Sequence, residues 1–183
     1  SDLPEYFSHM ENTTDVFSGT VSYAVGAWNF GFQAGYSDQN DKTLADSDTD
    51  AVNYGLSSSY YTEYLSISPS VSFNRSRYEP TSVRTDTTTA TLDLRGNFWD
   101  RRILYECAGT YTRTESSDDA VKQDIYNTNF RIAYMLSEKI WGLANPSAGF
   151  MGYYNTIEDY VYNTRDHDFT LLFVFSTSMP FVL

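Results

Sequence analysis

Residues 64–74, YLSISPSVSFN, decide how this chain folds. Apolar residues occupy every second position of the segment, and small hydroxyl or amide residues occupy the positions between them. Because successive side chains of a strand point to opposite faces, the segment predicts a β-strand with one apolar and one polar face. A helix would scatter the same residues around its whole circumference. The large apolar positions are Leu65, Ile67, Val71 and Phe73.

The same contrast recurs about nine times and predicts a chain of antiparallel hairpins, while helix is almost absent. Gly26-Ala27 predicts a two-residue type II′ turn, because glycine occupies its first central position. Short connections alternate with long polar ones, as in an up-and-down meander. The expected strands are 16–25, 28–36, 51–62, 64–74, 87–98, 103–112, 126–134, 147–156 and 169–183, and the expected long loops are 37–50, 75–86, 115–123 and 158–168.

Composition limits the class of protein further. The 183 residues fit one domain, 17% of them are aromatic, and the mean hydropathy of -0.44 leaves no apolar stretch long enough for a transmembrane helix. A transmembrane strand needs only about 10 residues, half of them apolar, so this hydropathy is compatible with a membrane barrel. The formal charge of -12 makes nucleic acid an improbable partner. Cys107 is the single cysteine, so no intrachain disulfide can form.

The expected polar face is also informative, because Ser, Thr, Asn and Gly with few charges would be an unusual outer surface for a soluble protein. Aromatic residues gather near the strand ends of the apolar face, as in the interfacial girdles of membrane barrels. The sequence therefore predicts an antiparallel, up-and-down transmembrane β-barrel of about 9–10 strands in residues 16–183, preceded by an arm in residues 1–15. The expected lipid-interface aromatics are Trp28, Tyr36, Tyr60, Trp99, Tyr111, Tyr134 and Trp141.

On these strands, turns and acidic loops the chain resembles the bacterial outer-membrane β-barrel proteins over residues 16–183. The resemblance implies outer-membrane lipid around the barrel, short turns in the periplasm and long loops outside. The last strand, 169–183, is similar to the strand that the barrel-assembly machinery recognises, with Phe181 near the end but Leu183 rather than Phe as the last residue. Even strand numbers are the rule in this class. Three explanations of the odd count stay open: the arm at Leu3–Met10 supplies a tenth strand, the chain is the C-terminal part of a larger barrel, or the pattern merges or misses a strand.

Four charged residues are expected on the polar face of neighbouring strands: Asp93, Arg95, Glu106 and Arg131. They are either lumen charges that satisfy one another or a constriction that tunes ion selectivity. The small side chains elsewhere on this face cannot fill a lumen, so water, a plug or a partner protein is expected there.

No catalytic residue, cofactor or metal site is predicted. The residues Asp166-His167-Asp168 allow a hydrolase or acyltransferase at the barrel rim, but no nucleophile motif accompanies them. The Asp-rich loop 38–50 has oxygen ligands suited to Ca²⁺ but lacks the glycine and the terminal Glu of an EF-hand. The main hypothesis is a small-solute channel or a membrane scaffold for a partner. The alternatives are a rim enzyme that uses His167 and a soluble all-β binding module.

Overall fold

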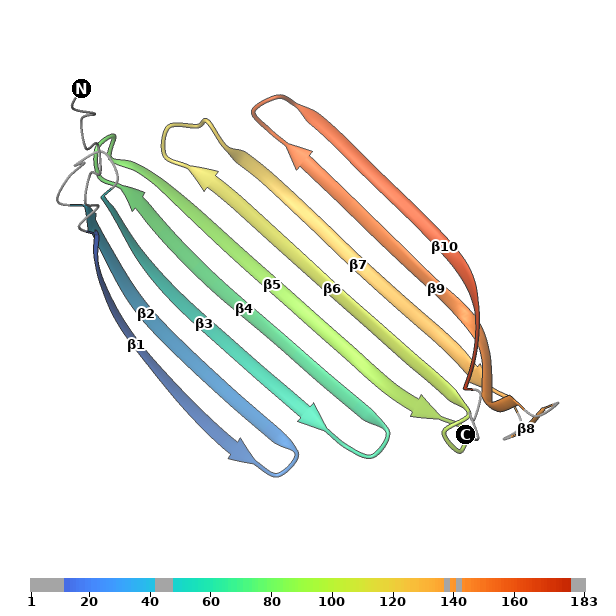
Figure 1. Cartoon of the computed structure of the whole chain (residues 1–183). Coiled ribbons are helices and arrows are strands. Elements are labelled where there is room, and N and C mark those ends of the chain that lie inside the picture. The colour runs from blue at the N-terminus through green and yellow to red at the C-terminus, as the bar shows by residue number, and fades with distance from the viewer. Residues whose placement is uncertain (1–11, 42–47, 137–138, 141–142, 179–183) are drawn as a thin grey trace, which may run out of the picture.

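The computed structural model describes residues 12–41, 48–136, 139–140 and 143–178, and every regular element in these ranges is a β-strand. Nine long strands lie side by side in chain order, each antiparallel to its neighbour, and the two-residue β8 pairs with β9 (Figure 1). The prediction of an all-β antiparallel meander is confirmed. The strands are β1 (Asn12–Val25), β2 (Trp28–Asp41), β3 (Thr49–Tyr61), β4 (Leu65–Tyr78), β5 (Val83–Phe98), β6 (Ile103–Ser116), β7 (Lys122–Met135), β8 (Lys139–Ile140), β9 (Leu143–Asp159) and β10 (Thr164–Ser178).

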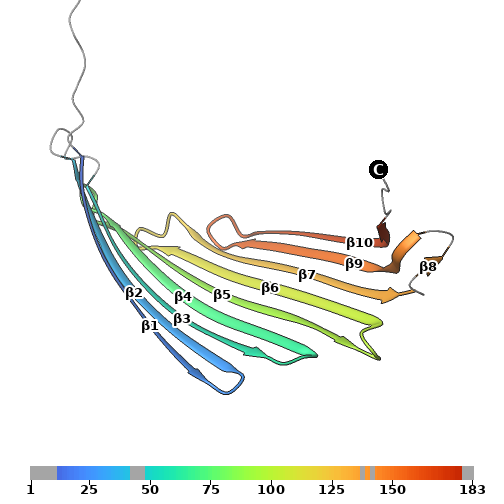
Figure 2. The same cartoon turned by 60° about the horizontal axis from the view of Figure 1, so that its bottom comes forward.

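The sheet is curved like a trough and stays open (Figure 2). In the described part of the chain, β1 pairs with β2 alone and β10 with β9 alone. The closed barrel expected from the sequence is therefore not formed in this structure. The reason is the direction of the strands, which alternates from each long strand to the next. β1 and β10 are the first and the ninth long strands, so they run in the same direction and cannot pair antiparallel.

The strands are longer, and the connections shorter, than the sequence pattern suggested. The expected long loop at 75–86 is reduced to residues 79–82, because β4 and β5 extend toward each other through it, and 115–123 and 158–168 shrink in the same way. β1 also begins at Asn12, inside the segment expected to be an arm. In these extended strand ends, charged and polar residues take the place of the apolar ones. The backbone hydrogen bonds between neighbouring strands continue there, because they do not depend on the side chains. Residues 1–11, 42–47 and 179–183 lie outside the described residues.

We call the end of the sheet with connections 26–27, 62–64 and 99–102 the turn end, and the opposite end the loop end. Gly26 has a φ of 59° and Ala27 does not have a positive φ, as a type II′ turn requires. The β5–β6 turn is closed by a 3.0 Å hydrogen bond from the Arg102 backbone N–H to the Trp99 carbonyl oxygen. Its Arg101 also forms an ion pair of 2.7 Å with Glu63 of the neighbouring turn.

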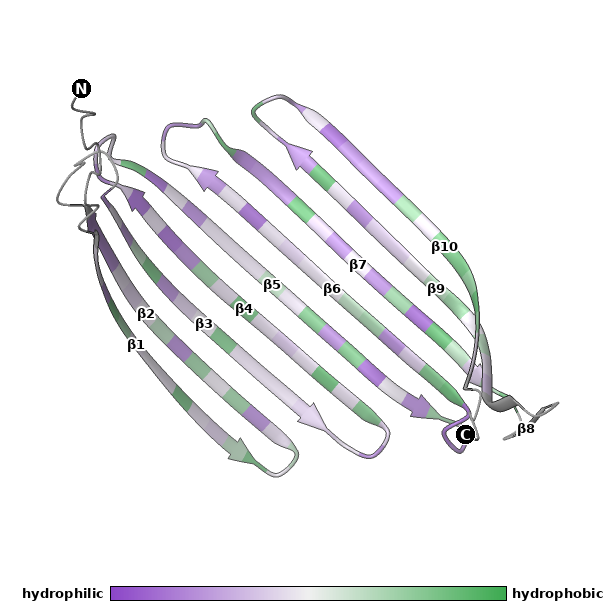
Figure 3. Cartoon of the chain, in the orientation of Figure 1, coloured by the Kyte–Doolittle hydropathy of each residue, from purple (hydrophilic) through white to green (hydrophobic). Residues whose placement is uncertain are grey.

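Hydrophobic and hydrophilic residues alternate along many of the strands (Figure 3), and the strand register keeps each class on one face. Phe32 lies opposite Leu56, and Leu56 lies opposite Val71, whereas Ser57 lies opposite Ser70 on the other face. We call the first the apolar face and the second the polar face. A register slip of one residue would turn apolar side chains onto the polar face, so the pattern specifies the pairing strongly.

This single layer has almost no interior. Each strand contacts chiefly its immediate neighbours, and few of the described residues are buried, among them Ala133, Asp124 and Thr156. Packing on the apolar face is lateral: the Phe130 ring lies so close over Gly152 that a Cβ there would come within 2.2 Å of it. A sheet normally buries its apolar face against another element, and no described residue covers this one. No helix in the described residues is long and apolar enough to cross a membrane.

Candidate functional site: the two faces of the sheet

The apolar face is exposed along its whole width. Its large side chains include Phe17 on β1, Leu56 on β3, Leu92 on β5 and Phe173 on β10, all of which are open to the surroundings. The face is also hollowed, with a volume of about 480 Å³, where Ser58 and Pro69 stand among larger apolar groups. Uncovered apolar surfaces of this extent occur where proteins contact other proteins, membranes or ligands.

The aromatics that the sequence placed at a lipid interface fall into two groups. Trp28 lies opposite Tyr60 at the turn end, with ring centroids 4.8 Å apart, and Trp99 of the β5–β6 turn lies 6.1 Å from Tyr134. Toward the loop end, Tyr111 lies 4.8 Å from Tyr126, and Tyr36 lies on β2 in the same half of the sheet. Trp141 lies outside the described residues. The aromatic groups thus stand at both ends of the apolar face.

Charged side chains border the apolar face at the loop end, a feature that sequence reasoning missed. Arg75 of β4 lies 2.8 Å from Asp86 of β5, and its guanidinium carbon is 5.3 Å from the centroid of the Phe73 ring on its own strand. Because these segments looked like loops, their alternation was overlooked: Arg75 continues the odd-numbered series of Val71 and Phe73. We call this row the charged border. Its further ion pairs are Arg84–Asp86 at 3.5 Å, Lys122–Glu115 at 3.7 Å, Arg165–Glu158 at 3.1 Å and Arg113–Glu115.

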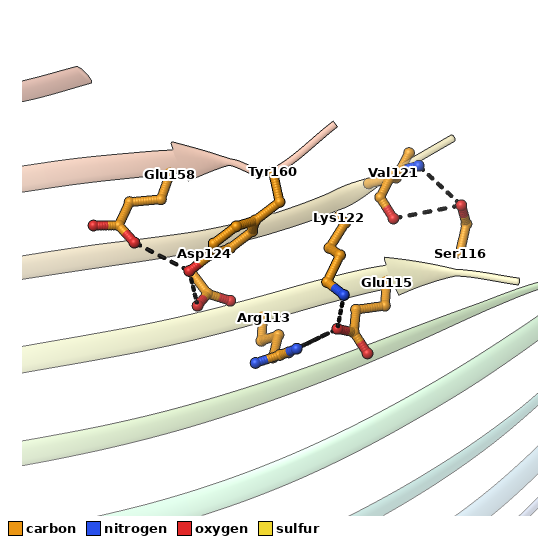
Figure 4. Close-up of polar contacts among 8 residues, drawn as sticks. All are labelled: Arg113, Glu115, Ser116, Val121, Lys122, Asp124, Glu158 and Tyr160. Carbon is orange, nitrogen blue, oxygen red and sulfur yellow. Dashed lines mark hydrogen bonds and ion pairs between the residues drawn. The ribbon is translucent and has the colours of Figure 1, made fainter. Parts of the chain in front are cut away.

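Two carboxylates of the charged border face each other directly (Figure 4). Asp124 is buried to 4% exposure opposite Glu158, and the Tyr160 hydroxyl lies 3.1 Å from an oxygen of each. Like charges in opposite positions destabilise a sheet, and the phenol reduces that repulsion by donating to them. The same hydrogen bonds raise the pKa of Tyr160 to about 12, because its neutral form is the donor.

The polar face is lined by small hydroxyl and amide groups that bond across strands. The Ser70 and Thr91 hydroxyls are 2.5 Å apart, and those of Thr89 and Thr112 are 3.4 Å apart. Two hollows of about 320 Å³ and 400 Å³ lie over Gly31, Ser57 and Ser70. Small side chains therefore leave open, water-sized space on this face.

The predicted charge cluster lies on the polar face, at the level where β5, β6 and β7 pair. Arg95 is opposite Glu106, and Glu106 is opposite Arg131, so the register places a row of alternating charge there. The ion pair found among these four described residues is Arg95–Asp93 at 3.9 Å. Glu106 therefore stands between two arginines without an ion pair to either, and with Arg95 it lines a hollow of about 320 Å³ near the turn end.

His167 does not share a face with its acidic neighbours. His167 of β10 lies opposite Thr156 of β9, on the apolar face. Asp166 and Asp168 point to the polar face by alternation. The three residues are thus not brought together as a catalytic group. Within the described residues, no group of three or more His, Cys, Asp or Glu side chains is placed to hold a metal ion. Residues 42–47 of the Asp-rich segment 38–50 lie outside them.

The chain matches no protein-family model, no curated protein and no solved structure.

Proposed function

We propose that residues 12–178 form part of the wall of a β-barrel in the outer membrane of a Gram-negative bacterium, and that the barrel is a passive channel for small solutes. The single observation that carries this proposal is the contrast between the faces. One face exposes large apolar groups from edge to edge, and the other exposes hydroxyls and amides. Lipid on one side and water on the other satisfy both faces at once.

The height of the apolar face supports this reading. Eight residue steps separate Trp28 from Tyr36 on β2, which at about 3.4 Å per residue is about 27 Å along the strand. With a strand tilt of about 40°, the band would be about 21 Å tall, close to the apolar band of about 25 Å in outer-membrane barrels.

The charged border supports it as well. Six of the chain's 12 Lys and Arg residues lie in this one row or just beyond it, where the apolar face ends. Long cationic side chains at the edge of an apolar band can lay their stems on it and reach lipid headgroups. These residues are Arg75, Arg77, Arg84, Arg113, Lys122 and Arg165.

The border also crosses the sheet at a slant. On β1 the last charged residue before the band is Asp15, whereas Arg165 of β10 is in the register row of Gly19. Four residues of drift across eight strand spacings is a slope of about 20°. A membrane plane that crosses tilted strands would produce a drift of this kind. Its slope of about 20° is smaller than the strand tilt of about 35–45° in closed barrels.

In this proposal the polar face lines a hydrated lumen, the loop end faces outward and the turn end faces the periplasm. The row of Arg95, Glu106 and Arg131 is a narrow point that sets ion preference, and the acidic excess of the chain favours cations. A plug or partner protein in the lumen would make the same wall a scaffold, and the barrel-assembly machinery would recognise the last strand.

Conductance across a planar lipid bilayer tests the proposal. We expect the purified protein, inserted from detergent, to give discrete current steps with a mild cation preference. Stable insertion without current steps would remove the channel and leave the scaffold. Extraction into buffer without detergent, as a monodisperse protein, would contradict the membrane location itself and favour a soluble binding module.

A further inference from the structure

One register row on the apolar face carries opposite charges on its two halves, on the loop-end side of the apolar band. Asp15 of β1 is opposite Asp38 of β2, and Asp38 is opposite Asp50 of β3. The row continues with Arg77 of β4, opposite Asp50, and with Arg84 of β5, opposite Arg77. We call these five residues the segregated row. Negative charge fills its β1–β3 half, and positive charge fills its β4–β5 half.

Most charges of the segregated row have no ion-pair partner in the described part of the chain. Arg84 lies 3.5 Å from Asp86, but no ion pair joins Asp50 to Arg77 although they are neighbours. The Arg77 guanidinium lies instead 3.5 Å from the Ser82 hydroxyl in the β4–β5 turn. Like charges in directly opposite positions destabilise a sheet. Counter-charges from outside this part of the chain would therefore stabilise the row.

A single occupant must offer both signs of charge to compensate the whole row. A divalent cation would serve only the aspartates, and no group of three or more His, Cys, Asp or Glu side chains in the described ranges is placed to hold one. Lipid phosphates would serve only the arginines. A second copy of the same sheet offers both signs. Turning it by 180° about an axis normal to the membrane sets its arginines against these aspartates, and its aspartates against these arginines.

We propose that two copies of this chain dock face to face within the membrane, through the apolar face of β2–β5 and around a two-fold axis between β3 and β4. The inference rests on the proposed membrane wall. Asp50 of each copy then faces Arg77 of the other, and Asp38 faces Arg84. The contact is isologous, because one row supplies both halves of it. The remaining apolar face of each copy stays in lipid.

The slope of the border is compatible with this arrangement. At a strand spacing of about 4.8 Å, a slope of about 20° separates the facing Asp50 and Arg77 in depth by about 2 Å, and Asp38 and Arg84 by about 5 Å. The long arginine side chain spans such differences. Nearer the turn end, the axis passes the edge of the hollow of about 480 Å³ that β1–β4 line. Leu92 of β5, which is 49% exposed, faces the hollow of the other copy.

Exchange of charges across the axis tests the proposal. Association of donor-labelled and acceptor-labelled copies is measured by energy transfer in lipid vesicles at increasing lipid dilution. Asp50→Arg and Arg77→Asp should each weaken association by about tenfold or more, because the two-fold axis makes every change act twice. The double variant, with both charges exchanged, should associate within about threefold of the wild type. Arg165→Glu, in the charged border outside the contact, is the control and should leave association unchanged.

Failure of the double variant to restore association would overturn the proposal, as would an equal loss in the Arg165→Glu control. Association that a chelator of divalent cations abolishes would show a cation between the aspartates instead, and would overturn it as well. Copies that insert into vesicles but stay monomeric would remove the docking and leave the membrane wall intact. Loss of vesicle association by the wild type would instead contradict the proposed function itself.

Distances between spin labels locate the axis. In a Cys107→Ser background, Ser57→Cys places a label on the polar face of β3, behind the contact, and Thr170→Cys places one on the polar face of β10. Sheets that pack about 10 Å apart around this axis should hold the two Ser57→Cys labels about 20–30 Å from each other, and the Thr170→Cys labels beyond about 35 Å. The reverse order of distances would place the contact near β10 and contradict the assignment.

Discussion

The polar and apolar faces of this sheet are built on the same backbone and differ by one residue of register, yet they expose opposite kinds of side chain. Thr91 and Leu92 are consecutive on β5; the first bonds to Ser70 across the polar face, and the second stands exposed among apolar neighbours. The described residues enclose almost no buried core between these faces. In the proposed barrel wall, lipid on one side and water on the other would stabilise the sheet.

The largest effect is expected from placing a charge on each face in turn. Leu92→Arg puts a cation in the middle of the apolar face, which should lower the free energy of unfolding from lipid vesicles by about 2–4 kcal/mol. Thr91→Arg puts the same side chain on the polar face, which is hydrated in the proposed barrel, and should change the free energy of unfolding by less than about 1 kcal/mol. Denaturant titration followed by tryptophan fluorescence measures both. Equal losses for the two variants would contradict the assignment of the faces.

Glycine substitutions give the next largest difference. A Cβ on Gly149 of the polar face would lie 2.0 Å from the Ile132 carbonyl oxygen, a backbone atom that cannot swing aside. Gly149→Ala should therefore cost about 1–3 kcal/mol of unfolding free energy. A Cβ on Gly109 of the apolar face would lie 3.8 Å from its nearest neighbour, the Thr128 hydroxyl oxygen. Gly109→Ala is therefore the matched control and should change the free energy of unfolding by no more than about 0.5 kcal/mol. Similar destabilisation of both variants would show that the β7–β9 spacing differs from that described.

A moderate effect is expected on ion selectivity. Arg131→Glu reverses the charge next to Glu106 on the polar face, a change of two charge units, and each unit at about 5 Å is worth about 1 kcal/mol in water. The permeability ratio of cation to anion should therefore rise by at least about fivefold, as measured by reversal potentials in a salt gradient. Arg165→Glu makes the same change in the charged border, outside the lumen, and should leave the ratio nearly unchanged. A shift of the same size in both variants would argue against a lumen on the polar face.

The smallest effect concerns a single phenol in the β9–β10 turn. Because the pKa of Tyr160 is raised to about 12, its neutral form stabilises the fold below about pH 10, and that contribution is lost as the pH rises through about 12. Ultraviolet titration of tyrosinate should show a step near pH 12 that Tyr160→Phe removes. Tyr162→Phe, in the same turn, should leave the step in place. A titration curve unaltered by Tyr160→Phe would mean that the phenol does not bridge Asp124 and Glu158.

The strands and their faces were predictable because the alternation is local. The alternating apolar and polar residues from Leu65 to Phe73 are enough to predict a strand and its two faces. The strand ends were not, because Arg75 and Glu115 continue the alternation with charged groups, which a reading of apolar periodicity takes for loops. The charged border was not predictable either, since it exists only once the register has set Arg75 beside Asp86. The open state of the sheet was not predictable from local patterns, because it concerns β1 and β10, which lie at opposite ends of the strand order.

Alternating solvent access along one strand tests the central claim most directly. Spin labels attached to single cysteines from Thr88 to Leu94 of β5, in a Cys107→Ser background and in lipid vesicles, report accessibility to oxygen, which concentrates in lipid, and to a water-soluble nickel chelate. We predict two opposite oscillations of period two, with oxygen access highest at Ala90, Leu92 and Leu94 and chelate access highest at Thr89, Thr91 and Asp93. Uniform access to the chelate at all positions would contradict the account, because both faces would then meet water.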